Sequence, residues 1–223
     1  MPVTTRTNED IKKDVIDQLY WDARVDASTV QVEVDEGSVI LNGNVPNYMA
    51  YEAAEDNAWA MAGVREVRNE LAIEHPAGVE LPGDSEVKAN VDNTLLWSPD
   101  IESSEIDTTV EKGLVTVRGT VDAYWKKVRV ENLVLGLAGV TGITNELTVV
   151  PTEKYEDKTI ADDIASALER NSLVDLDLID VEVQNGRITL TGTVPTLPAY
   201  RTVQTTAENT LGVIAVDNEL AIR

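Results

Sequence analysis

One nine-residue pattern occurs three times in this chain, and it limits the folds that the chain can adopt. The copies read GSVILNGNV at residues 37–45, GLVTVRGTV at 113–121 and GRITLTGTV at 186–194. Each copy places an alternating apolar run between two glycines, which is typical of a strand that follows a tight turn. The second glycines, Gly43, Gly119 and Gly192, are 76 and 73 residues apart. That period is too long for a solenoid repeat and fits three small independent domains.

The residues around each copy follow one order. Apolar residues at helical spacing open each unit, as at Val87, Val91 and Leu95 in the second. A strand of alternating pattern, a turn and the glycine-bracketed strand follow, and then a second helix near residues 47–62, 123–138 and 197–211. A final strand closes each unit. This order predicts an α+β fold of three tandem αββαβ domains, each a small three-stranded mixed sheet packed against two helices.

We place the domains at residues 8–74, 84–150 and 157–223. Proline, glycine and charged residues mark the linkers, 75–83 and 151–156, which restrict the relative placement of the domains without fixing it. The second helices are expected to end at the C′ glycines Gly63, Gly139 and Gly212. A phosphate cradle would need a helix to begin directly at the glycine of the repeated pattern. Thr120 and Val121 intervene after Gly119, so a fold-building hairpin is favoured.

The charge of the chain disfavours polyanionic partners. Its 18 basic and 40 acidic residues give a net charge of −22, spread over all three units. Such a field repels nucleic acid, and it repels anionic lipid unless a local basic patch intervenes. Lys126, Lys127 and Arg129 form the candidate patch, and an ordinary helix surface of mixed charge is the alternative.

The residue types needed for common catalytic sites are scarce. The chain has no cysteine, and its one histidine, His75, lies in a linker, so we expect neither a Ser-His-Asp triad nor a histidine zinc site. We therefore expect a protein that is not an enzyme and that carries no cofactor. Asp175, Asp177 and Asp180 leave calcium as an alternative, although they lack the glycine and distal glutamate of an EF-hand loop.

Two tryptophans lie off the apolar face of the first helices. Trp21 and Trp97 either pack at a domain edge or offer an aromatic face to a partner, and packing is favoured because large aromatics are usually mostly buried. Trp59 and Trp125 leave the same alternatives. Asn69, Asn145 and Asn218 recur in the last strands, and each is expected to hold a strand end by hydrogen bonds.

No apolar run reaches the length of a signal peptide or of a membrane span. We therefore expect a cytoplasmic protein, or a periplasmic one if a leader is removed, that is monomeric or weakly associating.

The αββαβ order, the glycines Gly43, Gly119 and Gly192, and the later Gly-Val pairs resemble the BON (bacterial OsmY and nodulation) domain family. The Gly-Val pairs begin at Gly63, Gly139 and Gly212. The chain is similar to triple-BON proteins of the osmotically inducible protein Y group. Their units begin with segments like Leu19-Tyr20-Trp21-Asp22 and Leu95-Leu96-Trp97-Ser98, from which the third copy departs at Leu168-Glu169-Arg170.

The resemblance implies a non-catalytic module of the bacterial osmotic or envelope stress response that contacts phospholipid surfaces or acts as a chaperone for client proteins. We expect Trp21, Trp97 and the Lys126–Arg129 patch to carry such contacts. A potassium-binding relative, in which a BON module accompanies a LysM domain, leaves small-ion sensing as an alternative. A pure protein-interaction scaffold is another.

Overall fold

The computed structural model describes residues 6–75, 78 and 81–222. The first unit contains α1 (Asn8–Trp21), β1 (Val30–Asp35), β2 (Ser38–Val45), α2 (Tyr48–Trp59) and β3 (Glu66–Ile73). The second contains α3 (Asp84–Leu96), β4 (Ile106–Glu111), β5 (Leu114–Val121), α4 (Tyr124–Leu135) and β6 (Gly142–Val149). The third contains α5 (Asp157–Glu169), β7 (Ile179–Gln184), β8 (Arg187–Val194), α6 (Leu197–Asn209) and β9 (Ala215–Ile222). The predicted fold class, three αββαβ units, is confirmed.

Each unit has a three-stranded sheet with the glycine-bracketed strand in its centre. In the second unit β5 pairs antiparallel with β4 and parallel with β6. A two-residue turn, Lys112 and Gly113, makes the antiparallel connection with φ values of 53° and 79°. Two positive φ values suit a type I′ hairpin, which favours glycine. The parallel connection needs a crossover, and α4 supplies it.

A short 3₁₀ helix that the sequence did not predict precedes the first strand of each sheet: Ala27–Thr29, Ser103–Glu105 and Leu176–Leu178. In the third copy the carboxylate of Asp175 accepts a hydrogen bond from the backbone N–H of Asp177 (3.2 Å) and caps this turn. The carboxylate of Asp175, one member of the candidate calcium triad, is therefore explained by local backbone structure.

Each unit has its own apolar core between its two helices and the inner face of its sheet. In the second unit Val87, Val91 and Leu95 of α3 meet Val115 and Val117 of β5, and each is 2% exposed or less. The helical and alternating spacings of the sequence are thus confirmed as core positions. Each small domain therefore has its own apolar core to stabilise it.

Gly119 cannot carry a side chain in this fold. Its φ is +132°, and a Cβ atom there would lie 1.9 Å from the carbonyl oxygen of Glu105. The equivalent glycines repeat this geometry: a Cβ atom would lie 2.0 Å from the Thr29 oxygen at Gly43 and 2.1 Å from the Leu178 oxygen at Gly192. The repeated pattern therefore has glycine where the central strand comes very close to the end of the 3₁₀ helix that precedes the first strand.

The prediction of C′ glycines at Gly63, Gly139 and Gly212 is wrong. Helix α4 ends at Leu135 with Gly136 as its cap, and Gly139 lies beyond this cap in the loop that leads to β6. A Cβ atom at Gly139 would lie 2.8 Å from Cγ2 of Val87, because this loop packs on the start of α3. Gly63 likewise lets its loop approach Ile11 of α1, and Gly212 lets its loop approach Tyr155 just before α5.

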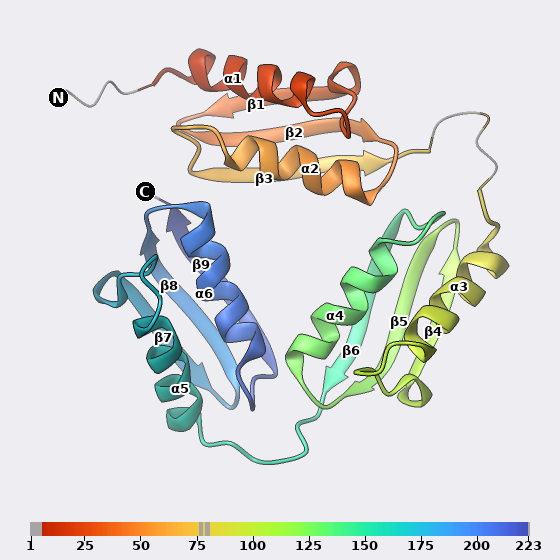
Figure 1. Ribbon diagram of the computed structural model, residues 1–223, viewed down its shortest axis with the longest axis vertical. Helices are drawn as coiled ribbons and strands as arrows, with labels where there is room; N and C mark the ends of the chain where they lie inside the picture. The colour runs from red at the N-terminus through yellow and green to blue at the C-terminus, as the bar shows by residue number, and fades with distance from the viewer. Residues whose placement is uncertain (1–5, 76–77, 79–80, 223) are drawn as a thin grey trace.

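The three units surround a common centre, with α2, α4 and α6 on the inner side and α1, α3 and α5 on the outer side (Figure 1). Tyr48 at the start of α2 packs on the second core, and Tyr124 at the start of α4 packs on the third. The third unit returns to the first, since Trp59 at the end of α2 packs against both of their cores. The domains therefore form a closed ring that the linkers alone did not predict.

Among the residues that the structure describes, no helix has the length and apolar character needed to cross a bilayer.

Candidate interaction surfaces

The ends of α1 and α3 carry exposed aromatic and aliphatic side chains. Trp21 is 81% exposed and Tyr20 is 76% exposed, and their rings lie edge to face with centroids 6.2 Å apart. Trp97 and Leu96 are 82% and 64% exposed. The favoured expectation, that these indoles pack at a domain edge, is therefore wrong. We call the pairs Tyr20–Trp21 and Leu96–Trp97 the two aromatic tips.

Helical geometry explains why the tips face solvent. The buried stripes of the first helices end at Leu19 and Leu95, which are 1% and 2% exposed. Trp21 and Trp97 follow two residues later, a rotation of about 200° around the helix axis. They therefore point away from the core that Leu19 and Leu95 enter.

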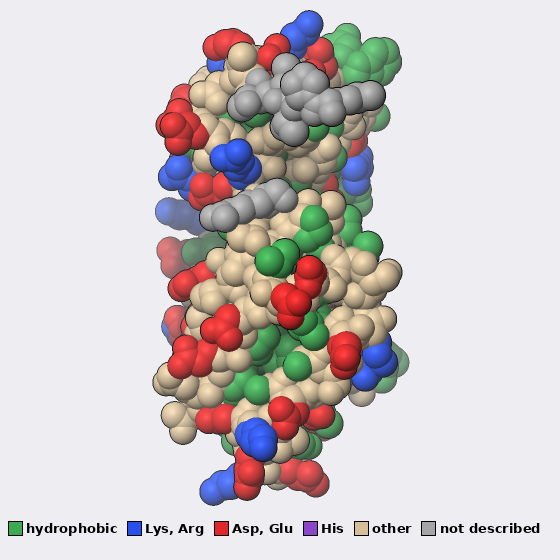
Figure 2. All heavy atoms as spheres, turned by 90° about the vertical axis from the view of Figure 1, so that its left-hand side faces the viewer, with side chains coloured by type: hydrophobic (Ala, Val, Ile, Leu, Met, Phe, Trp, Pro, Cys, Tyr) green, Lys and Arg blue, Asp and Glu red, His purple; other side chains and the backbone are tan. Residues whose placement is uncertain are grey.

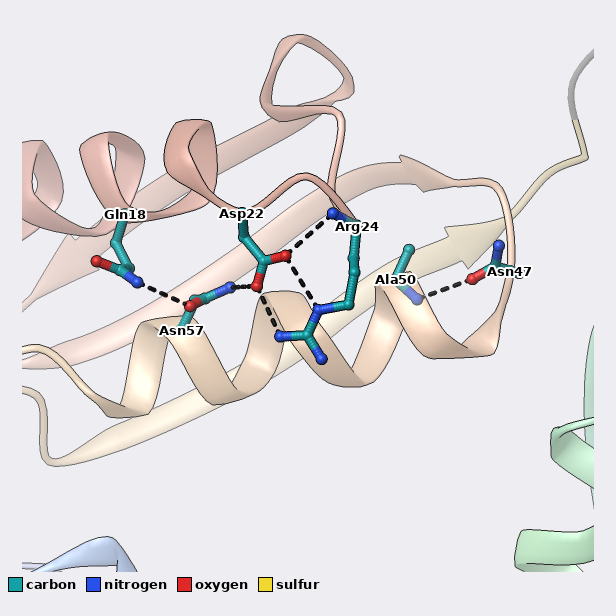
Figure 3. Close-up of polar contacts among 6 residues, drawn as sticks. All are labelled: Gln18, Asp22, Arg24, Asn47, Ala50 and Asn57. Atoms are coloured by element: carbon teal, nitrogen blue, oxygen red, sulfur yellow. Dashed lines mark hydrogen bonds and ion pairs between the residues drawn. The ribbon is translucent and has the colours of Figure 1, made fainter.

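A hydrogen-bonded network holds the chain directly after Trp21 (Figure 3). The carboxylate of Asp22 accepts hydrogen bonds from Nη2 of Arg24 (2.7 Å) and from Nδ2 of the buried Asn57 in α2 (2.7 Å). Nε2 of Gln18 donates to Oδ1 of Asn57 (3.1 Å). The hydrogen bonds from Arg24, and then that from Asn57, hold the pKa of Asp22 well below its usual range. The first tip is therefore tied to the second helix of its domain.

The second tip is held differently, and the third unit has none. The hydroxyl of the buried Ser98 donates to the carbonyl oxygen of Thr94 (2.7 Å) just after Trp97. Glu169 and Arg170 occupy the equivalent positions at the end of α5, and both are exposed. The molecule therefore presents two apolar tips and one charged counterpart.

The structure does not leave Lys126, Lys127 and Arg129 as a free basic patch. Nζ of Lys126 lies 2.7 Å from the carboxylate of Asp122, and Nε of Arg129 lies 3.9 Å from that of Asp100. Nζ of Lys127 donates to the carbonyl oxygen of Leu147 (2.8 Å). Each cation has its own partner, as on a helix surface of mixed charge.

The first and third domains meet through a small set of contacts between α2 and α6. Arg201 forms an ion pair with Asp56, and the rings of Trp59 and Tyr200 are stacked with centroids 6.4 Å apart. We call these four residues the clasp. Within the described ranges Asp56–Arg201 is the one ion pair that joins two domains. The clasp therefore closes the ring where no linker joins the domains.

The inner side of the ring is acidic and partly desolvated. Burial raises the pKa of Glu208 near the end of α6, and the negative charge of Glu131 on α4 adds to this shift. A hydrogen bond from Nε2 of Gln204 (2.8 Å) partly offsets it. Burial also raises the pKa of Tyr124. These carboxyl and phenol groups therefore lie between domains and away from bulk water.

The recurring asparagines join each last strand to the second helix of its domain. Nδ2 of Asn145 donates to the carbonyl oxygen of Lys127 (3.0 Å) and to Oε2 of Glu131 (3.1 Å). Its Oδ1 accepts from the N–H of Leu147 (3.3 Å). Asn69 makes the same contacts with Tyr51, Glu55 and Leu71, while Asn218 contacts Gln204 and Leu220. The predicted hydrogen bonding is confirmed, but these asparagines lie within their strands and not at strand ends. We call them the asparagine brackets.

Replacing Asn145 with alanine is expected to lower the free energy of unfolding by about 1–3 kcal/mol, because it leaves half-buried backbone groups without partners. Thermal unfolding measures the change. Asn132→Ala on the exposed face of α4 is the matched control and should change stability by no more than about 0.5 kcal/mol. Equal transitions for the two variants would contradict a structural role for the bracket.

The described part of the chain contains no group of three or more His, Cys, Asp or Glu side chains placed to hold a metal ion. Asp175, Asp177 and Asp180 thus do not assemble into the calcium site that the sequence left open. The single histidine, His75, lies just beyond β3, in the segment that the sequence marks as a linker.

The repeated units and their glycines correspond to a known family. The profile of the BON domain matches residues 7–75, 83–151 and 156–223. The chain belongs to the BON domain family. The predicted resemblance, three BON domains in tandem, is thereby confirmed, and the αββαβ units described above are these domains.

Two curated relatives share parts of this triple-BON chain. Osmotically-inducible protein Y of Escherichia coli (strain K12) is 26% identical over 143 residues, which span 61% of this chain and 71% of that protein. The 21 kDa hemolysin of Actinobacillus pleuropneumoniae is 27% identical over 114 residues, 50% of this chain and 59% of that protein. The match therefore spans less than two thirds of the hemolysin.

A solved structure also aligns along nearly the whole chain. The C-terminal domain of CdsD, a structural protein of the type III secretion system of Chlamydia trachomatis, is 17% identical and covers 96% of this chain and 98% of its own. The TM-score is 0.26, so this alignment carries no inference about the BON ring.

Sequence reasoning identified Trp21 and Trp97 but missed the contacts between BON domains. Tyr48 and Tyr124 occupy the same position in the first and second units, and Tyr51 and Tyr200 coincide one helical turn later in the first and third. An aromatic residue repeated at the start of a second helix is the signal that aligned copies offer. Whether such a residue contacts another domain depends on which domain lies opposite it, and the spacing within one domain cannot show that.

Proposed function

We propose that this triple-BON protein is a binding protein of the bacterial osmotic or envelope stress response, and that its two aromatic tips attach it to zwitterionic phospholipid surfaces. The observation that carries the proposal is the repeated exposure of Trp21 and Trp97, at 81% and 82%. The stress role is supported by the likeness to Osmotically-inducible protein Y.

Indole rings favour the interface between lipid headgroups and acyl chains, because one end is apolar and the other can donate a hydrogen bond to water. Leu96 and Tyr20 extend the apolar contact beside each indole. Two tips on one chain also bind more tightly than either alone, since the second attaches at high effective concentration.

Charge favours zwitterionic over anionic lipid. The chain carries −22, and Lys126, Lys127 and Arg129 are already engaged within the protein. Anionic vesicles should therefore repel the protein at low salt, and screening should weaken that repulsion.

Flotation with phosphatidylcholine vesicles tests the proposal. Replacing Trp21 or Trp97 with alanine should weaken retention roughly tenfold each, because each indole brings apolar area out of water. Replacing both should abolish retention. Leu173→Ala and Leu211→Ala remove exposed apolar side chains elsewhere and should leave flotation unchanged.

Protection of a client protein from aggregation is measured in parallel with the same variants. Vesicle retention that depends on the two tryptophans supports lipid attachment. Client protection without retention would replace the lipid proposal with a chaperone function. Failure of both assays, or equal retention of the double variant, would reject the aromatic tips as the binding surface.

A further inference from the structure

The closed ring forms a groove between the first and third domains. Its walls are the β1–β2 turn near residues 35–38, the chain from 59 to 66 between the end of α2 and the start of β3, residues 195–198 at the start of α6, and residues 219–222 of β9. Its volume is about 1410 Å³. Small-molecule pockets measure about 300–1,000 Å³, so this groove has the size of a peptide site.

The groove combines apolar walls with an acidic rim. Val64, Leu220 and Ile222 are buried in its walls, and Trp59 and Leu197 are half-buried beside them. The exposed acids on the rim are Asp35, Glu36, Glu66 and Glu219, and Arg65 is the basic residue among the lining residues. Figure 2 shows this side of the molecule, with acidic side chains spread over it among basic and apolar ones.

Within the described residues, three of the rim acids form no ion pair. Glu66 accepts a hydrogen bond from Ser38 (3.0 Å) and lies 3.6 Å from Nε of Arg68. In the part of the chain that the structure describes, Asp35, Glu36 and Glu219 have no ion-pair partner. The groove has apolar walls, and unpaired carboxylates lie on its rim. This combination favours an occupant that is apolar on one side and cationic on the other.

We propose that this groove binds a basic amphipathic peptide segment of a partner protein. The segment places apolar side chains between Trp59 and Leu197 and its lysines or arginines beside Glu36 and Glu219. Recognition by side chains is favoured over strand addition, because Oδ1 of Asn218 already accepts the N–H of Leu220 at this edge (3.1 Å). The site is separate from the aromatic tips and does not depend on lipid attachment.

Fluorescence anisotropy of a labelled peptide of alternating lysine and leucine tests the proposal. The full-length protein should bind it, binding should weaken as salt is added, and peptides with glutamate in place of lysine or serine in place of leucine should not bind. Glu36→Lys with Glu219→Lys should weaken binding by about tenfold or more. Asp107→Lys with Asp180→Lys changes the net charge equally on exposed sheet faces and should leave binding within about twofold.

The clasp supplies a second test, because the groove exists only while the first and third domains touch. Arg201→Glu replaces the attraction to Asp56 with repulsion and should weaken peptide binding by about threefold, because the pair is about half exposed. Asp56→Arg combined with Arg201→Asp reverses the pair and should restore binding. Absence of binding to the unchanged protein, equal losses in the two lysine variants, or full binding by Arg201→Glu would each overturn the proposal.

Discussion

Replacing Gly119 with alanine should lower the free energy of unfolding of the second domain by at least about 3 kcal/mol. The new Cβ atom would lie 1.9 Å from the carbonyl oxygen of Glu105, and the pairing of Gly119 with Ile106, the next residue, prevents the two chains from moving apart. A φ of +132° adds strain for any residue with a side chain. The expected result is loss of the pairing between β4 and the central strand β5.

Hydrogen exchange measures this effect domain by domain, which matters because three cores need not unfold together. Amides of β4 and β5 should lose protection while those of β7 and β8 keep it. Gly136→Ala is the control, since a Cβ atom there meets nothing closer than 3.6 Å and the cap is in the αR region. That variant should be neutral or more stable by up to about 1 kcal/mol. Similar protection in the two variants would contradict the steric explanation.

Replacing Trp59 with alanine should destabilise the protein by about 2 kcal/mol and open the ring. The indole is half-buried and packs against the cores of both the first and the third domain. Its loss also removes the stacking partner of Tyr200, and the remaining Asp56–Arg201 ion pair of the clasp is already about half exposed and contributes little. Small-angle scattering should therefore show a larger radius of gyration.

Trp125→Ala is the matched control for the clasp. Trp125 is also half-buried on a second helix, and Nζ of Lys126 lies 5.7 Å from the centroid of its ring. It belongs to none of the three described cores. We expect an unchanged radius of gyration for this variant. If Trp59→Ala leaves the scattering curve unchanged as well, the linkers and the tyrosine contacts are sufficient to hold the ring closed.

The sequence predicts the features that depend on strand and helix geometry within a single domain. Gly119, the stripe of Val87, Val91 and Leu95, and the bracket at Asn145 depend on strand and helix geometry inside one unit, and the structure confirms them. Gly139 was assigned to the wrong position because helix α4 ends earlier than its pattern suggests. Its loop packs on α3, which is distant in the sequence.

Contacts between domains were not predictable in the same way. Trp21 and Trp59 look alike in sequence, since both are tryptophans at the ends of helices. One is 81% exposed and the other packs against two cores, and the difference lies in whether the helix is on the outer or inner side of the ring. The spacing of apolar residues within one unit does not indicate which helix faces a neighbouring domain.

The asparagine brackets have a further consequence for a chain built from near copies of one domain. Strands β3, β6 and β9 are edges of their sheets, and an open edge invites pairing with another sheet. Oδ1 of Asn69, Asn145 and Asn218 accepts the N–H of Leu71, Leu147 and Leu220, which takes a donor away from each edge. The same side chains that hold strand to helix thus guard the three similar sheets against aggregation and against exchanging strands with one another.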